Sequence, residues 1–195
     1  MEKTIILIDG GYYDAINRWI KAETSKRMDM EKLSLKICAG KNHIRTKFYH
    51  SNPYQSTTPT ADEKLHFQGA QEFQYTINHI KNHEFWVSGR VVLQPFHCPI
   101  CRKRYEIPKQ KGVDVAIALD LVKMARKKVA DCFVLIAGDE DLSSAVEMAQ
   151  EELCNVIIYY VHEPAQRIFC SAMLRSMASD RTQMNLAFLK DCLLA

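Results

Sequence analysis

Residues 4–11 have the sequence TIILIDGG, an apolar run that ends on an aspartate and two glycines. A short and continuous run of aliphatic, largely β-branched residues is typical of a strand that is buried on both faces, as in a parallel sheet. Two further runs have the same character: residues 133–137 (FVLIA) and residues 156–161 (VIIYYV). The opening stretch therefore predicts the first central strand of an α/β protein, with a turn directly after it.

Segments with helical patterns separate the predicted strands. In residues 113–128, for example, Val113, Ile117 and Leu121 recur at the four-residue spacing of one helix face. The other predicted helices cover residues 12–22, 29–38, 61–82 and 142–152, and a further strand is predicted at 44–49. Alternation of strands and helices predicts a three-layer α/β/α fold around a mainly parallel central sheet.

Length and composition limit the remaining choices. The chain has 195 residues, of which 47% are hydrophobic, and this fits one domain over residues 1–195. No apolar run approaches the roughly 18 residues of a membrane span, and the first residues lack the layout of a signal peptide. We therefore expect a cytoplasmic protein without a membrane partner. The net charge of +3 is too small to identify a nucleic-acid partner by itself.

Four aspartates occupy positions where chemistry is expected. Asp9 follows the first strand, Asp139 and Asp141 follow the strand at 133–137, and Asp114 lies near the start of a helix. A single aspartate after a strand is commonly a turn or cap residue. The carboxyl ends of parallel strands, however, open onto one edge of a sheet, where ligands bind. Convergent carboxylates there suit Mg²⁺ or Mn²⁺ and the hydrolysis of phosphodiesters.

Three segments carry a resemblance to a known family. They are IDGG at residues 8–11, KGVDVAIALDLV at 111–122 and IAGDEDLSSAV at 136–146. In this order they resemble the signature segments of NYN domains, especially the LabA-like branch, within the PIN-like nuclease class. The resemblance implies a PIN-like fold, one or two bound Mg²⁺ or Mn²⁺ ions and cleavage of RNA. It also implies that the catalytic and metal-binding residues are Asp9, Asp114, Asp139 and Asp141.

Two further residues are assigned supporting roles. Many relatives have asparagine three residues after the first aspartate, where this chain has Tyr12, so Asn17 is a candidate to compensate from the second shell. Asp120 lies six residues after Asp114, about 120° around the helix and roughly 9 Å along it. The two carboxylates are therefore not expected to bind one ion, and Asp120 is interpreted as a second-shell residue, a salt-bridge partner or a contact to the chain ahead of it.

Residues 95–111 are predicted to form a basic loop that contains a CxxC motif. Its cations are candidates to contact phosphates, with the salt-dependent binding that such contacts give, and Tyr105 is a candidate to stack on a base. These cations are Arg102, Lys103, Arg104, Lys109 and Lys111.

The CxxC motif has the spacing of half a structural zinc site. Its candidate ligands are His97, Cys98 and Cys101, and a complete site needs further ligands. His79, His83 and Cys38 are the candidates within the chain. Two alternatives stay open: a redox-active pair, and thiols that bind nothing.

These observations favour a metal-dependent ribonuclease, endonucleolytic on single-stranded RNA, although single-stranded DNA is not excluded as a substrate. The alternative is a catalytically weak or inactive NYN module that binds RNA or a protein partner in a regulatory role. A small-molecule phosphatase is disfavoured, because Asp9 lacks a second aspartate two residues later. The sequence leaves the oligomeric state open, with a homodimer among the candidates.

Overall fold

The computed structural model describes residues 1–194. The strands are β1 (Lys3–Asp9), β2 (Asn42–His50), β3 (His83–Val87), β4 (Arg90–His97), β5 (Arg104–Lys111), β6 (Cys132–Ile136), β7 (Asn155–Tyr160) and β8 (Asp180–Gln183). The helices are α1 (Gly10–Thr24), α2 (Met30–Ile37), α3 (Ala61–His79), α4 (Val113–Arg126), α5 (Ser143–Glu151), α6 (Ala172–Met177) and α7 (Leu186–Lys190), with 3-10 turns at Glu140–Leu142 and Pro164–Gln166.

Six strands form one sheet in the order β3-β2-β1-β6-β7-β8, and every neighbouring pair in it is parallel. The chain passes from β1 to β2 and β3 on one side. It later continues from β6 to β7 and β8 on the other side. The boundary between β1 and β6 is therefore the topological switch point of the sheet, beside which α/β proteins bind their ligands.

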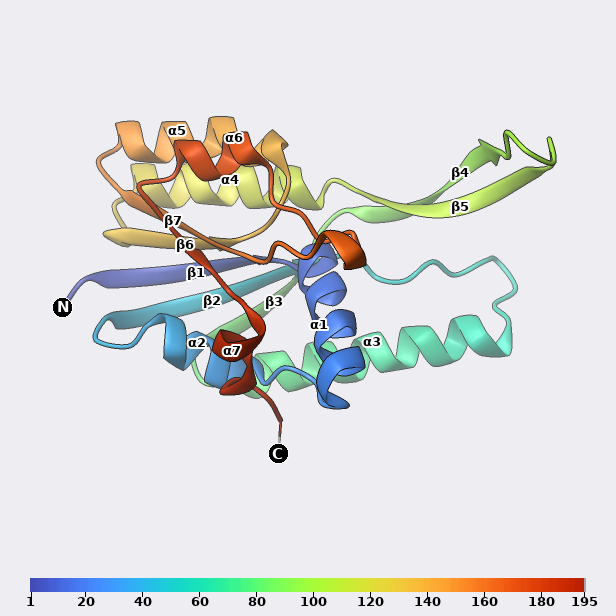
Figure 1. Ribbon diagram of the computed structural model, residues 1–195, viewed down its shortest axis with the longest axis horizontal. Helices are drawn as coiled ribbons and strands as arrows, with labels where there is room; N and C mark the ends of the chain where they lie inside the picture. The colour runs from blue at the N-terminus through green and yellow to red at the C-terminus, as the bar shows by residue number, and fades with distance from the viewer. Residues whose placement is uncertain (195) are drawn as a thin grey trace.

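Helices cover both faces of this sheet (Figure 1). On one face, Ile6 and Ile8 of β1 pack in a core with residues of α1, α2, α3 and α7. On the other face, Ile5 and Leu7 pack in a core with residues of α4, α5 and α6. The alternation follows from the two-residue repeat of a strand. The predicted three-layer α/β/α architecture with a parallel central sheet is thus confirmed.

The prediction of a basic loop at residues 95–111 is wrong in its conformation. Residues 104–111 form β5, which pairs antiparallel with β4 in a separate two-stranded hairpin. The many charges of β5 concealed its strand character. Pro95 and Pro108 fit there, because both strands of a ribbon are edge strands and a proline need not donate to a ladder.

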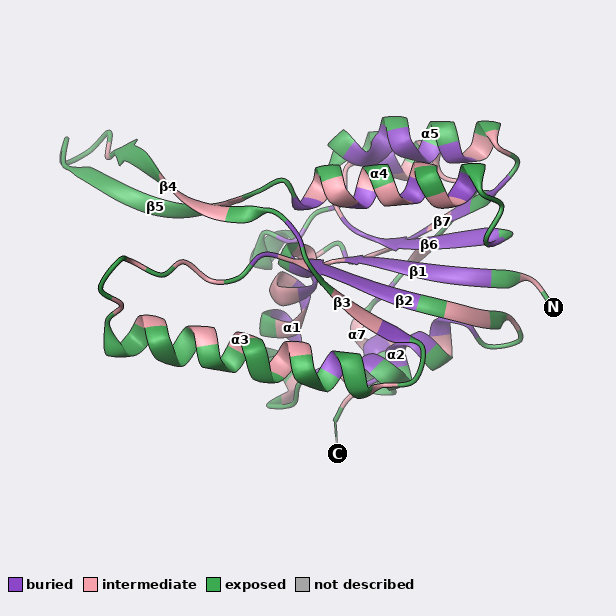
Figure 2. Ribbon diagram, turned by 180° about the vertical axis from the view of Figure 1, so that it is seen from behind, coloured by how far each residue is buried: buried purple, intermediate pink, exposed green. Residues whose placement is uncertain are grey.

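The hairpin and most of α3 project beyond the sheet. Figure 2 shows them largely exposed, in contrast to the buried central strands, and Ile77 is the one fully buried residue among those of α3. The predicted helix at 61–82 ends earlier, at His79. No helix in residues 1–194 combines the length and the apolar character needed to cross a membrane.

Candidate active site

Asp9 closes β1 and caps the helix that follows. Its Oδ1 accepts a hydrogen bond of 2.9 Å from the backbone N–H of Gly11, as an N-cap residue of α1. Its Oδ2 has no hydrogen-bond partner among the described residues. Gly10 is required next to it, because a Cβ at that position would lie 2.7 Å from Cγ of His50 and from the carbonyl oxygen of Tyr49. The DGG motif thus places one free carboxylate oxygen at the edge of the sheet.

Two more carboxylates follow β6, the neighbour of β1. Oδ1 of Asp139 accepts a hydrogen bond of 3.1 Å from the backbone N–H of Asp141, and Asp139 caps the 3-10 turn Glu140–Leu142. Asp114 lies in the first turn of α4. The predicted cap role of a strand-end aspartate therefore holds for Asp9 and Asp139, but it uses only one oxygen of each side chain.

The four aspartates affect one another electrostatically. Burial, followed by the charge of Asp114, raises the pKa of Asp9 from 3.8 to about 6. Burial also raises the pKa of Asp114, and the charges of Asp139 and Asp141 add to this effect. Like charges that face one another disfavour ionisation. Asp114 of α4 therefore lies within electrostatic range of Asp9 after β1 and of Asp139 and Asp141 after β6.

The donor set suits a hard cation that keeps part of its water shell. All candidate ligands are carboxylate oxygens, and a nearby cation would relieve the repulsion that raises the pKa values of Asp9 and Asp114. Within residues 1–194, no three Asp, Glu, His or Cys side chains lie close enough to hold one ion directly. Mg²⁺ typically binds proteins through one or two carboxylates and retains several waters. The residues thus fit a hydrated Mg²⁺ or Mn²⁺ ion.

Tyr12 replaces the asparagine of many relatives with a structural contact. Its hydroxyl donates to the carbonyl oxygen of Val161 and accepts from the N–H of Val161, both at 2.9 Å. The side chain therefore ties α1 to the end of β7. Asn17 does not compensate at the acidic edge, contrary to the sequence prediction. Its Oδ1 accepts a hydrogen bond of 3.0 Å from the N–H of Met28, two turns along α1 from Asp9.

Asp120 acts as a salt-bridge partner, one of the three roles that the sequence suggested. It pairs with Nζ of Lys47 and accepts a hydrogen bond of 2.8 Å from the hydroxyl of Tyr49. Lys47 is buried, and its ammonium also lies 4.0 Å from the ring centroid of Trp86. Asp120 thus neutralises a buried cation of β2 and fixes α4 against the sheet.

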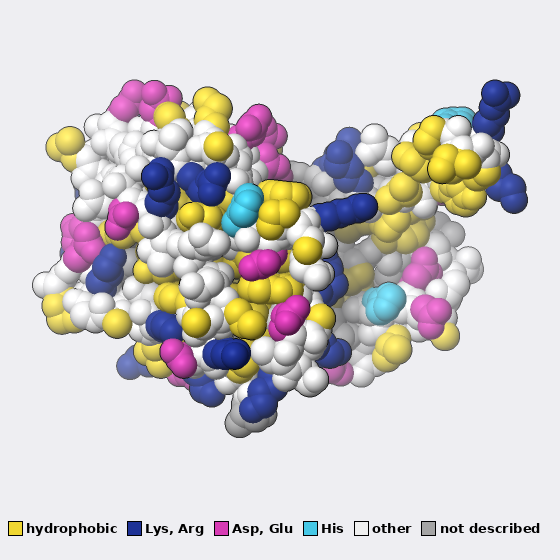
Figure 3. All heavy atoms as spheres, viewed as in Figure 1, with side chains coloured by type: hydrophobic (Ala, Val, Ile, Leu, Met, Phe, Trp, Pro, Cys, Tyr) yellow, Lys and Arg dark blue, Asp and Glu magenta, His cyan; other side chains and the backbone are white. Residues whose placement is uncertain are grey.

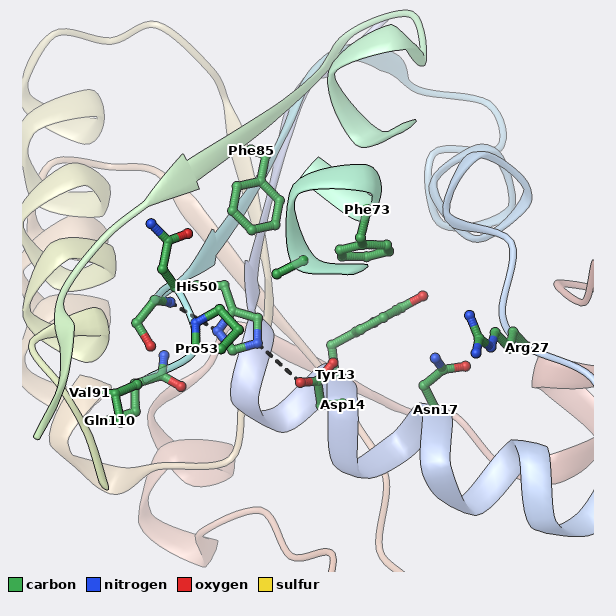
Figure 4. A pocket seen from close by; sticks show the side chains of 13 residues that line it. Tyr13, Asp14, Asn17, Arg27, His50, Pro53, Phe73, Phe85, Val91 and Gln110 are labelled. Atoms are coloured by element: carbon green, nitrogen blue, oxygen red, sulfur yellow. Dashed lines mark hydrogen bonds and ion pairs between the residues drawn. The ribbon is translucent and has the colours of Figure 1, made fainter. Parts of the chain in front are cut away.

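Sequence reasoning missed a histidine–aspartate pair beside the acidic edge. Nε2 of His50 lies 3.0 Å from Oδ2 of Asp14, and Nδ1 of His50 accepts a hydrogen bond of 2.9 Å from the N–H of Ser51 (Figure 4). The acceptor role of Nδ1 places the proton of the neutral ring on Nε2. Both ring nitrogens are therefore engaged, and the ring is held in place. No sequence motif marks this pair, because it depends on β2 lying beside β1 in the sheet.

Two hollows adjoin this edge. One, of about 510 Å³, contains Asp9 and Asp139 and is also lined by Arg167 and Phe169. The other, of about 430 Å³, begins at the His50–Asp14 pair, and Figure 4 shows the aromatic rings of Tyr13, Phe73 and Phe85 around it. It shares three lining residues with a third hollow between α3 and the base of the hairpin. These residues are Pro53, Val91 and Gln110.

The predicted phosphate-binding cations are not gathered in one place. Lys111 ends β5 beside the start of α4, and Lys109 lies nearby on the same strand. Arg102, Lys103 and Arg104 lie at the far end of the hairpin. The last of its eight residue pairs, His97–Arg104, is seven residues along the strand from the first pair at the base. At about 3.4 Å per residue, that end is about 24 Å from the base. These three cations therefore face a surface remote from the aspartates, whereas Arg167, which the sequence did not single out, lines the acidic hollow.

Comparison with known proteins identifies the family. The sequence profile of the NYN domain matches residues 3–178. The chain belongs to the NYN domain family. NYN domains share the PIN-like α/β fold, and the six-stranded parallel sheet described above agrees with that architecture.

Two individual proteins are similar to this NYN domain protein. The uncharacterized protein y4oD from Sinorhizobium fredii is 39% identical over 54 residues, which are 28% of this chain and 25% of that protein. The crystal structure of a protein of unknown function from Vibrio parahaemolyticus superposes with a TM-score of 0.59 at 20% identity, covering 99% of this chain and 96% of the other. The second likeness is one of fold.

Proposed function

We propose that this NYN domain protein is a metal-dependent ribonuclease of the LabA-like branch, which cleaves single-stranded RNA internally. The observation that carries the proposal is the charge repulsion at the switch point of the sheet, where Asp114 is repelled by Asp139 and Asp141 and itself repels Asp9. Like charges held close together cost stability unless a cation accompanies them. Asp9 and Asp139 also cap the elements that follow them, but a cap uses only one oxygen of each side chain. A metal-dependent nuclease site gives the remaining oxygens a role.

The four aspartates would hold Mg²⁺ or Mn²⁺, in part through water. When bound, the ion supplies activation of a water molecule and stabilisation of charge on the phosphate. The protein itself contributes orientation. Oδ2 of Asp9 is free for this purpose, because Oδ1 is held by the N–H of Gly11. The same holds for Asp139, whose Oδ1 is held by the N–H of Asp141.

The hollows beside the aspartates suit a single strand of nucleic acid. Arg167 offers a cation for a phosphate, and Phe169, 51% exposed, offers an aromatic face on which a base can stack. On the other side, Lys109 and Lys111 extend the basic surface along the hairpin. A strand that crosses the acidic edge would meet both groups. A duplex is less suitable, because stacking on a side chain needs an unpaired base.

The decisive experiment is cleavage of end-labelled single-stranded RNA and DNA with Mn²⁺ or Mg²⁺. The wild type is compared with Asp139→Asn and with Glu147→Gln, a control that removes an exposed carboxylate of α5. Asparagine preserves the cap that Asp139 provides, so the variant should fold. We expect metal-dependent internal cutting by the wild type and the control, and none by Asp139→Asn. Cutting that persists in Asp139→Asn or in EDTA would refute the proposal.

A second function has one observation in its favour. Tyr12 occupies the position of a polar helper residue, and its hydroxyl is fully engaged with Val161. This favours a catalytically weak module that binds RNA or a protein partner. Binding of RNA by the wild type in a gel shift, with no cutting under any metal, would select this alternative over the nuclease. Preferential cutting of the DNA substrate would instead correct the substrate class.

A further inference from the structure

The end of the β4–β5 hairpin is organised around its two cysteines. The N–H of Cys98 donates to the carbonyl oxygen of Lys103 at 3.0 Å, and the N–H of Arg102 donates to the carbonyl oxygen of Cys98 at 2.9 Å. Arg102 has a φ of 56°, which allows the chain to turn sharply after Cys101. These bonds close residues 98–103, here called the hairpin tip, into a tight turn with two free thiols.

Both cysteines of the CxxC motif belong to this one turn. Sγ of Cys101 lies 3.6 Å from the hydroxyl of Tyr105. Two cysteines separated by two residues in a turn supply half of a tetrahedral zinc site, as in zinc ribbons. A structural zinc ion needs two more protein ligands, because such sites are closed to water.

The same chain does not supply those ligands. Cys38 is buried in the main core. The ring of His83 is buried and bonded through both nitrogens to Ser34 and to the carbonyl oxygen of Lys81. Nδ1 of His79 lies 2.7 Å from the carbonyl oxygen of Tyr75 on α3. His97 does not complete a group either, since no three potential ligands converge anywhere in residues 1–194. The predicted set of His97, Cys98 and Cys101 is therefore reduced to the two cysteines.

The ribbon face that carries Tyr105, the neighbour of the Cys101 thiol, is suited to a protein partner. Phe96 and Tyr105 are directly paired across the strands, and Ile107 lies on the same face as Tyr105. All three are about half exposed, at 46%, 47% and 46%. Figure 3 shows hydrophobic side chains gathered at this end of the hairpin, with Lys and Arg beside them. Exposure of this apolar face to water is unfavourable, so a protein partner would stabilise it by burying it. The face lies next to the hairpin tip with its two cysteines.

We propose that two copies of this chain bind one Zn²⁺ ion between their hairpin tips, with Cys98 and Cys101 of each copy as the four ligands. A twofold axis through the ion would pair the same surface on both copies, which is the commonest arrangement of homodimers. The charges agree. Four thiolates around Zn²⁺ leave a net charge of −2, and Arg102, Lys103 and Arg104 of each copy surround it with positive charge. Without the metal, these cations would hold the two tips apart.

The test uses the full-length protein, purified without chelator and with a reductant that does not bind zinc. Metal content and molar mass in solution are measured together, by elemental analysis and light scattering. We expect about one Zn²⁺ per two chains in a dimer. The dimer should become a monomer in EDTA and in the double variant Cys98→Ser/Cys101→Ser. The single variant Ile100→Ser, which changes the exposed residue between the cysteines, should keep the zinc.

Cobalt substitution gives a second, independent measure. Titration of the metal-free wild type with Co²⁺ should saturate at one ion per two chains, with the thiolate charge-transfer absorption of a four-sulfur site. Three results would overturn the proposal: a monomer with one metal ion per chain, a dimer that survives EDTA, or a metal-free protein with a Cys98–Cys101 disulfide. The hairpin tip lies outside both cores. Metal content, molar mass and cobalt absorption are all measured without RNA, so none of these results depends on nuclease activity.

Discussion

Replacing Asp9 by asparagine should stabilise the metal-free protein at neutral and alkaline pH. In the folded protein the pKa of Asp9 is raised from 3.8 to about 6, so the ionised side chain destabilises the fold. The sign follows from linkage. The folded state binds the proton of Asp9 more tightly than the unfolded state does. The contribution of Asp9 to the free energy of unfolding is therefore fully present below pH 3.8 and is lost as the pH rises through about 6. Asparagine is uncharged at every pH and escapes this loss.

The magnitude follows from the shift. About 2 pKa units, at about 1.4 kcal/mol each, give an advantage of about 3 kcal/mol to Asp9→Asn near pH 8. With the same two pKa values, the advantage falls to about 1 kcal/mol near pH 4.5. The hydrogen bond to the N–H of Gly11 should persist, because asparagine is as good an N-cap as aspartate. The gain is therefore not offset by loss of the helix cap.

The assay is urea unfolding in EDTA at both pH values, with Glu147→Gln as the control for removal of an exposed carboxylate. Repeating it with Mn²⁺ adds a second expectation. The wild type should gain stability by mass action, and Asp9→Asn should gain less. If Asp9→Asn is less stable than the wild type near pH 8 in EDTA, the reasoning about the acidic edge is wrong.

Three further substitutions test the supporting contacts. Tyr12→Phe removes two hydrogen bonds to Val161 and should lower the free energy of unfolding by about 1–3 kcal/mol, as measured in urea; no loss would show that the contact is dispensable. Asp120→Asn leaves the buried cation of Lys47 without its counter-charge and should cost about 3 kcal/mol, measured in the same way; Lys47→Met in the Asp120→Asn background should recover part of it. Gly89→Ala places a Cβ 2.3 Å from a carbonyl oxygen of β5 at a φ of +72°. It should cost at least about 1 kcal/mol and make the hairpin more susceptible to limited proteolysis, and unchanged susceptibility would argue against a fixed hairpin base.

The central strands could be predicted because burial on both faces selects aliphatic and β-branched residues along their whole length. TIILI of β1 and FVLI of β6 are such runs. The edge strands carry no comparable signal. β8 has the sequence DRTQ and β5 the sequence RYEIPKQK, and both are strands only because a neighbour offers a ladder of hydrogen bonds. β3 and β4 are separated in sequence by only two residues, but the bend at Gly89, with a φ of 72°, places them in two different sheets.

The acidic edge was predictable for a related reason. Strand-end positions converge in a parallel sheet whatever the details of packing, so Asp9 and Asp139 could be placed from sequence. His50 and Asp14 could not, since their contact joins β2 to α1 and depends on which strand lies beside β1. The predicted role of Asn17 was wrong for the same kind of reason, because its actual partner is the backbone of Met28, in the connection between α1 and α2, which no motif marks.

The short connection between the hairpin and α4 has a mechanical consequence. One residue, Gly112, separates the last residue of β5 from the first residue of α4, and a Cβ on it would lie 3.4 Å from Cα of Gly89. The crossing of Gly89 and Gly112 therefore sets the direction in which the ribbon leaves the domain. Asp114 lies two residues beyond Gly112, in the first turn of α4. The same glycine crossing thus fixes both the path of the hairpin and the start of the helix that carries one of the four aspartates.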